Sequence, residues 1–175
     1  MTSHIALLRG INVGANTLKM ERLREVFAEL GFAGVRTYVQ SGNVLFGAKG
    51  TPAGLSATIE EKLRGETRLP VSVIVRTPAQ LQRIIDANPF LREEGVDPRK
   101  LHVTFLAGAA SKSGRAALAA VKSGADSWHA AGDVVYLHCP GGYGRTKLTN
   151  ARIEKLLATT RNWATVTALY EMSCR

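Results

Sequence analysis

Hydrophobic and polar residues follow two alternating patterns in the first half of the chain. Short apolar runs rich in β-branched residues are typical of buried strands, and stretches with apolar residues every three or four positions are typical of amphipathic helices. In chain order these patterns predict a strand at 5–8, a helix at 20–30, a strand–turn–strand at 36–46, a helix at 53–69 and a strand at 70–75. The resulting order, β-α-β-β-α-β, is that of a ferredoxin-like unit.

The second half repeats much of this pattern after an interruption. A short amphipathic helix is predicted at 78–87, and two prolines with a charged run then break the periodicity over 88–98. Beyond it we predict a strand at 101–106, a helix at 114–122, a hairpin with arms 127–131 and 134–138, and a helix at 151–157. Residues 165–172 fit a last strand or a helix with a threonine cap, and we prefer the helix.

Together these elements predict an α+β fold in which two ferredoxin-like β-α-β-β-α repeats form one compact unit. We place the first repeat and its trailing helix in residues 1–90, a linker in 91–98, and the second repeat with a C-terminal helix in 99–175. Each half is small for an independent domain, so we expect the two repeats to form a continuous unit.

The turn of the first hairpin carries more polar side chains than a tight turn needs. Gln40, Ser41 and Asn43 surround Gly42, and glycine or asparagine at this place allows a positive φ. We therefore predict that the turn forms the polar edge of a binding site. The alternative is that these side chains bond only to their own backbone.

Two glycine-containing loops add further candidate groups. In Arg9–Gly14, between a strand and a helix, glycines let backbone N–H groups approach an anion, although the same glycines also suit a plain turn. In Gly141–Asn150, three glycines precede Arg145, Lys147 and a predicted helix start, which suits a phosphate or carboxylate; the alternative is a flexible basic loop with an ordinary N-cap. Neither loop has dinucleotide-binding or Walker spacing, so we predict no cofactor.

A last polar stretch precedes the C-terminal element. Arg161 and Trp163 could stack on a planar ligand, since a guanidinium and an indole both favour such contacts. We favour the structural interpretation, in which Trp163 is buried under the last helix and Asn162 caps a turn.

The net charge determines which partners have to be considered. The chain of 175 residues has a formal net charge of +9; residues 1–96 contain twelve Lys or Arg and nine Asp or Glu, and residues 97–175 contain eleven and five. A basic surface favours nucleic acid, nucleotides or other anions without specifying which. We predict no membrane partner, because no apolar run is long enough to span a bilayer and residues 1–9 lack a signal-peptide pattern.

Cysteine and histidine usage adds little catalytic chemistry. Two cysteines are too few for a disulfide framework, so we expect reduced thiols in a cytoplasmic protein. The four histidines show no metal-ligand spacing with Cys, Asp or Glu, so no metal site is predicted. No Ser–His–Asp set and no carboxylate pair stands out, and whether the protein is an enzyme stays open.

Several of these stretches occur together in a known family. They are Ala6–Gly14, Lys19-Met20, Thr37–Val44, Asn88–Phe90, Lys147–Asn150, Arg161–Trp163 and Thr165-Val166. On these residues the chain resembles, almost end to end, the domain-of-unknown-function family numbered 1697, whose members are mainly small bacterial proteins. It departs from the family pattern at Ala15, where glycine is usual, and at Thr146, where serine is usual. The resemblance implies a two-repeat α+β fold related to ferredoxin-like units, and it implies no activity, ligand or catalytic residue.

Three functional hypotheses follow from these observations. We prefer binding of a small anionic ligand that bears a phosphate or a carboxylate; the alternatives are a nucleic-acid-binding protein and a structural or assembly module without a ligand. The oligomeric state stays open. The predicted ligand-binding residues are Arg9, Asn12, Gln40, Ser41, Asn43, Lys147, Asn150 and Arg161.

Overall fold

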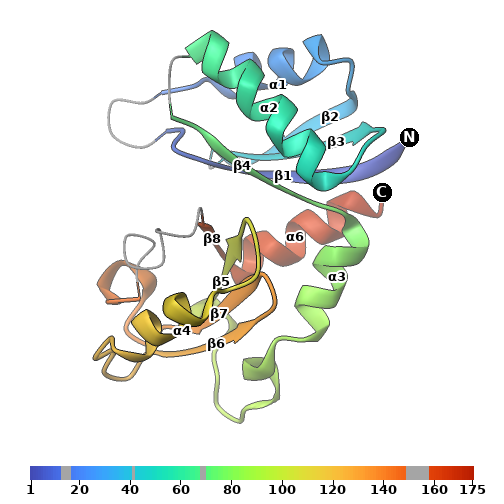
Figure 1. Cartoon of the computed structure of the whole chain (residues 1–175). Coiled ribbons are helices and arrows are strands. Elements are labelled where there is room, and N and C mark those ends of the chain that lie inside the picture. Colours follow the sequence, from blue (N-terminus) through green and yellow to red (C-terminus); the bar gives the residue numbers. More distant parts are fainter. Residues whose placement is uncertain (13–16, 41, 68–69, 149–157) are drawn as a thin grey trace. The chain divides into compact units, whose positions relative to one another are not determined.

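The computed structural model describes residues 1–12, 17–40, 42–67, 70–148 and 158–175 (Figure 1). Two compact units can be distinguished. Unit 1 comprises Met1–Gln82 with Leu169–Arg175, and unit 2 comprises Arg83–Ala168. The predicted linker at 91–98 lies within unit 2, and the predicted division into repeats stays a prediction.

Unit 1 has one four-stranded antiparallel sheet in the order β2-β3-β1-β4. Its elements are β1 (Thr2–Arg9), α1 (Met20–Glu29), β2 (Ala33–Tyr38), β3 (Asn43–Ala48), α2 (Pro52–Thr67), β4 (Ser72–Arg76) and the start of α3 (Pro78–Asp86). Helices α1 and α2 lie on the same face of the sheet (Figure 1). The order of these elements agrees with the ferredoxin-like order predicted for the first half.

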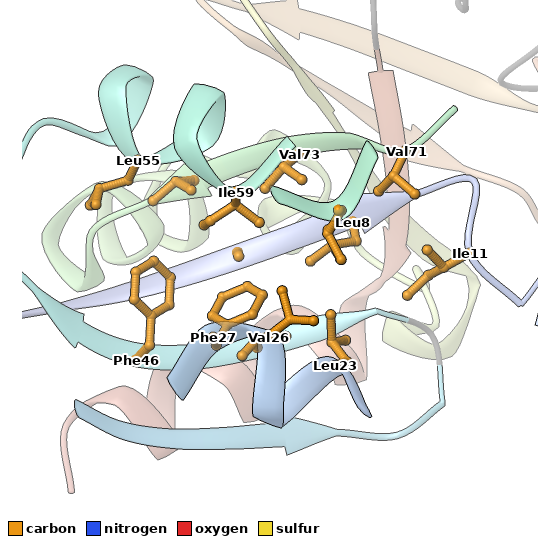
Figure 2. Close-up of a cluster of buried hydrophobic side chains, with 14 of the residues drawn as sticks. Leu8, Ile11, Leu23, Val26, Phe27, Phe46, Leu55, Ile59, Val71 and Val73 are labelled. Atoms are coloured by element: carbon orange, nitrogen blue, oxygen red, sulfur yellow. The ribbon is translucent and has the colours of Figure 1, made fainter. Parts of the chain in front are cut away.

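The core of unit 1 fills the space between this sheet face and the two helices. Because strand side chains alternate between faces, Ala6 and Leu8 of β1 point to the same side as Val44 and Phe46 of β3. Figure 2 shows the aromatic and aliphatic side chains of the two helices and the sheet pointing into one space. The helices contribute the residues that the 3.6-residue spacing predicts as buried: Leu23, Val26, Phe27, Leu55, Ile59 and Leu63.

Unit 2 has a second four-stranded antiparallel sheet in the order β6-β7-β5-β8. Its strands are β5 (Leu101–Leu106), β6 (Ser127–Ala131), β7 (Val134–His138) and β8 (Ala158–Asn162). Its helices are α4 (Lys112–Ala119), the end of α3 and the 3-10 helices η1 (Pro89–Arg92), η2 (Pro98–Lys100) and η3 (Tyr143–Arg145); α6 (Trp163–Ser173) begins here and ends in unit 1. Leu118 of α4 packs on Leu106, Val135 and Leu137 of this sheet.

The structure confirms the α+β class and the helix preferred for residues 165–172, and it corrects two other assignments. The strand β8 was missed, because it carries Thr159, Thr160 and Arg161 and therefore has no apolar run. The helix predicted at 114–122 begins two residues earlier, at Lys112, and ends at Ala119. The helix predicted at 151–157 lies outside the described residues.

Candidate functional site

A pocket of about 220 Å³ lies in unit 1 where the loop after β1 meets the start of α1 and the turn of the first hairpin. We call it the α1 pocket; its lining residues are Asn12, Thr17, Leu18, Lys19, Met20, Glu21 and Gln40. Two of the predicted polar stretches therefore contribute to it, through Asn12 and Gln40. These residues are 28 positions apart in the chain, and the fold brings them together.

The side chain of Asn12 bonds to two segments that line the pocket. Its Nδ2 donates to the carbonyl oxygen of Gln40 at 3.0 Å, and its Oδ1 accepts from the backbone N–H of Leu18 at 2.8 Å. Its φ of 55° is in the left-handed region, which asparagine tolerates better than most residues. An amide nitrogen carries two hydrogens, so Asn12 retains a second N–H donor beyond the one used for Gln40.

The hairpin turn packs against the end of β1. The backbone N–H of Leu8 donates to the carbonyl oxygen of Gly42 at 2.8 Å. At Gly42, where φ is +71°, a β-carbon would lie 2.8 Å from Cδ1 of Ile11 and 3.0 Å from Cβ of Leu8, so only glycine fits. Val39 has a φ of 49°, which is unusual for a β-branched residue, and Ser41 lies outside the described residues. The turn thus presents Gln40 to the pocket by close packing and local strain.

Helix α1 begins at the pocket without a capping side chain. Lys19, the N-cap residue, is extended (φ −62°, ψ 140°) and its side chain makes no capping hydrogen bond. The first backbone N–H groups of a helix have no intrahelical acceptor, and they form the positive end of the helix dipole. The backbone N–H groups at the start of α1 therefore add a partial positive charge next to the pocket.

Two charged side chains of opposite sign line the pocket. Lys19 and Glu21 are exposed, and within the described ranges neither forms an ion pair. The neighbouring charges of α1 are all engaged: Arg22 bridges to Glu25, Glu29 and Glu66, and these carboxylates raise the pKa of its guanidinium. The charges beside the pocket are thus the ones left available to a ligand.

Two other predicted site residues of unit 1 are not among the residues that line this pocket. Asn43 is fully buried in β3, and its Nδ2 donates to the carbonyl oxygen of Tyr38 at 3.1 Å. Arg9 ends β1 opposite Ser72 of β4. The contact of Asn43 is thus the one expected if the polar side chains of the hairpin bond to their own backbone.

The predicted residues of unit 2 lie in two different environments. Lys147 is exposed between Thr146 and the buried Leu148, whose backbone N–H donates to Oγ1 of Thr146 at 3.1 Å. Arg161 is buried in β8, where its Nη1 donates to Oγ1 of Thr159 at 2.6 Å and to the carbonyl oxygen of Thr160 at 2.9 Å. Burial lowers the pKa of Arg161 to about 10. Asn150 lies outside the described residues.

Sequence reasoning missed Lys19 and Glu21 as members of the candidate site. One signal was present: the apolar periodicity of α1 starts at Met20 without a Ser, Thr, Asp or Asn in front of it. In a helix without a side-chain cap, the first backbone N–H groups can donate to an anion. The same stretch was noted only as part of the family resemblance.

Metal and membrane features were searched for in the described part of the chain. No group of three or more His, Cys, Asp or Glu residues there could hold a metal ion. None of the helices in that part is long and apolar enough to cross a bilayer. Cys139 and Cys174 are both free, the first buried and the second exposed.

The fold and the pocket define an α+β protein with two antiparallel four-stranded sheets and a small polar pocket beside the first helix of unit 1. The chain belongs to the family described as "Protein of unknown function (DUF1697)", whose sequence pattern matches residues 1–136, which confirms the resemblance. The structure is similar to that of "conserved bacterial protein SP0830 from Streptococcus pneumoniae", with a TM-score of 0.79, 20% sequence identity, and coverage of 100% of this chain and 99% of that one. At this identity the similarity shows the fold alone. No curated protein matches the sequence.

Proposed function

We propose that the protein binds a small anionic ligand, bearing a carboxylate or a phosphate, in the α1 pocket. The observation that carries the proposal is the convergence of Lys19, the uncapped start of α1 and the amides of Asn12 and Gln40 on one pocket. An ammonium group, backbone N–H groups and amide donors are the partners that an anion requires. The protein acts in the cytoplasm on this proposal, where its free thiols stay reduced.

The size of the pocket limits the ligand. Pockets for drug-sized ligands enclose roughly 300–1,000 Å³. The α1 pocket, with about 220 Å³, is smaller and suits a metabolite of a few heavy atoms or one terminal group of a larger molecule. Catalysis is not part of the proposal.

Within the described part of the chain, the other residues predicted to bind the ligand are not among those that line the α1 pocket. Lys147, Asn150 and Arg161 belong to unit 2, and Arg9, Ser41 and Asn43 belong to unit 1. We assign them a supporting role, in which they shape the loops or attract anions to the surface through their charge.

A second candidate, binding of nucleic acid, rests on the net charge of +9. When the residues are assigned to the structural units, unit 1 contains eleven Lys or Arg and seven Asp or Glu, and unit 2 contains twelve and seven. The excess of positive charge is therefore nearly equal in the two units. The higher positive charge of the second half of the sequence does not make unit 2 much more basic than unit 1. Long-range attraction of an anion is compatible with this distribution, which singles out neither unit as the one that binds nucleic acid.

The test is a titration followed by amide chemical shifts in two-dimensional NMR. Acetate and inorganic phosphate should shift the backbone amides of residues 19–21 and the side-chain amides of Asn12 and Gln40. Lys19→Gln should weaken the binding about tenfold, because a hydrogen bond to a charged group contributes about 1.5–3 kcal/mol. Lys49→Gln removes an exposed lysine outside the pocket and serves as the charge-matched control.

Two results would contradict the proposal. One is the absence of shifts at the pocket for every anion tested, and the other is an equal loss of affinity in the two lysine variants. Short single- and double-stranded oligonucleotides at low salt form a separate arm, since electrostatic binding is strongest there. Oligonucleotide binding that spares the pocket amides would favour the nucleic-acid candidate.

A further inference from the structure

We propose that the ligand of the α1 pocket is a small zwitterion of the α-amino-acid class, with its carboxylate at Lys19 and its ammonium group at Glu21. This inference rests on the proposed function and narrows it. The starting observation is that the residues that line the pocket include one cationic and one anionic residue, Lys19 and Glu21, together with the polar residues Asn12, Thr17 and Gln40.

The two charges do not neutralise each other. Lys19 is the extended N-cap residue and Glu21 lies in the first turn of α1, so the two residues do not have the i, i+3 or i, i+4 spacing that brings charges together on a helix. Within α1, Arg22 pairs with Glu25 at 3.0 Å across three positions, whereas no ion pair joins Lys19 to Glu21. Both charges are therefore present at the pocket without an ion pair between them.

A purely anionic ligand would meet an unfavourable partner in this pocket. Its charge would be attracted by Lys19 and by the start of α1, and repelled by Glu21. Juxtaposed like charges reduce affinity strongly and serve to reject wrong ligands. A ligand with an ammonium group two bonds from its carboxylate converts this repulsion into a second ion pair, so Glu21 becomes a specificity-determining residue.

The remaining polar groups suit the same ligand. The side chain of Gln40 has both an acceptor oxygen and donor N–H groups, so it can serve either end of a zwitterion. Leu18 and Met20 provide a modest apolar wall for a short side chain. The volume of about 220 Å³ limits that side chain to a small one.

The experiment compares ligands that differ in one group. Glycine is titrated against acetate, and L-alanine against propionate, with inorganic phosphate and methylamine as further probes, and the amide shifts of residues 19–21 and of Gln40 are followed. We expect each amino acid to bind about tenfold more tightly than the matching carboxylate. In Glu21→Gln this ratio should fall to about one, whereas the exposed Glu61→Gln outside the pocket should leave it unchanged.

The outcomes separate this inference from the proposed function. If acetate and phosphate shift the pocket amides as strongly as glycine does, and Glu21→Gln tightens their binding, the zwitterion is wrong and the anion site stands. If none of the probes shifts the pocket amides, both ideas fail. If the amino acids bind more tightly but Glu21→Gln and Glu61→Gln reduce the ratio equally, the assignment of the ammonium partner is overturned.

Discussion

The starts of α1 and α4, which follow the first strand of their units, differ in how their backbone N–H groups are satisfied. In unit 2 the side-chain oxygen of Ser111 accepts from the N–H of Gly114 at 3.0 Å. In unit 1 Lys19 has nearly the same backbone angles (φ −62°, ψ 140° against φ −64°, ψ 157°) but offers no cap. A cap occupies the donors that an anion would use. The start of α4 is therefore capped by a side chain of unit 2, whereas the start of α1 has no side-chain cap and lies beside a pocket.

The comparison is justified because the units correspond in detail elsewhere. The edge strands β4 and β8 each carry a buried arginine near their end, Arg76 as the last residue of β4 and Arg161 as the last but one of β8. In both, Nη1 donates to the carbonyl oxygen of the preceding residue, at 3.1 and 2.9 Å. The next residue, Thr77 or Asn162, accepts with its side chain from the N–H three positions later. Both units thus pass from their last strand into a helix in the same way, and a difference between them points to a difference in role.

The largest expected effect concerns the cores under the two first helices. α1 buries Leu23, Val26 and Phe27, whereas α4 buries Leu118. Phe27→Ala removes a ring that meets Phe46 edge-on, with centroids 5.2 Å apart, and should lower the free energy of unfolding by about 3–5 kcal/mol.

Leu118→Ala should cost about 2 kcal/mol, the low end for such a change, because the rest of α4 is mostly exposed and the site can relax. Urea unfolding of both variants measures the difference. Equal losses would show that the two helices contribute equally, and the comparison of the units would lose its energetic basis.

Much of the fold could be predicted because its signals are local. Apolar positions in β1, α1, α2 and β4 follow the periods of strands and helices, and the side chains predicted as inward-facing are buried. β8 escaped because it carries Thr159 and Thr160 instead of apolar residues, and only pairing with β5 reveals it as a strand. Propensity alone cannot distinguish such an edge strand from a loop.

The candidate site was less predictable, since it depends on contacts between distant segments. Asn12 and Gln40 were recognisable as surplus polar groups, and they lie in the pocket. Asn43 was chosen for the same reason, yet its side chain closes its own hairpin. Residue type could not show which of these residues lie at the pocket, because an amide can bond to backbone groups in either place, as Asn12 also does. Lys19 was overlooked because no sequence motif marks it. Its importance depends on the absence of a side-chain cap at the start of α1, which the structure shows.

Exchanging the two helix starts tests the central comparison directly. Ser111→Ala should lower the free energy of unfolding by about 1 kcal/mol, as for other lost N-caps. Lys19→Ser gives α1 the residue that caps α4, and since the backbone already has the required angles, the free energy of unfolding should rise by about 0.5–1 kcal/mol. The same variant should lose affinity for anions. Thermal unfolding and the NMR titration measure the two effects, and a Lys19→Ser protein that keeps full affinity would contradict a role for this helix start in binding.

A smaller effect is expected where the sheets differ in polarity. The cross-strand pair Ala6–Val75 of unit 1 corresponds to Thr104–Thr160 of unit 2, whose hydroxyl oxygens are 2.8 Å apart. Thr104→Val should cost about 0.5–1 kcal/mol, since a hydrogen-bonded threonine pair contributes an amount of this order.

The double variant T104V/T160V turns the threonine pair into an apolar pair like that of unit 1. It should cost less than the sum of the two single changes, because residues in contact are not additive. Denaturant unfolding of the unmodified protein, the two single variants and the double variant measures the coupling energy between the two threonines. Strict additivity would mean that the short contact between Thr104 and Thr160 contributes nothing to stability.

The smallest expected effect is a dependence on pH that both units share. His4 of β1 and His102 of β5 hold the same place in their strands and stack on aromatic rings, Phe46 and Tyr143. Burial lowers the pKa of each imidazole below its ordinary value of 6.5. Between the lowered pKa and 6.5 the unfolded chain binds more protons than the folded one, so the free energy of unfolding should be largest above pH 6.5 and decline as the pH falls below it. His4→Gln and His102→Gln remove the titrating group, and each should flatten the decline of unfolding free energy between pH 7 and pH 5 relative to the unmodified protein. If only one variant flattens it, the two histidines are not equivalent, and the correspondence between β1 and β5 does not extend to their electrostatics.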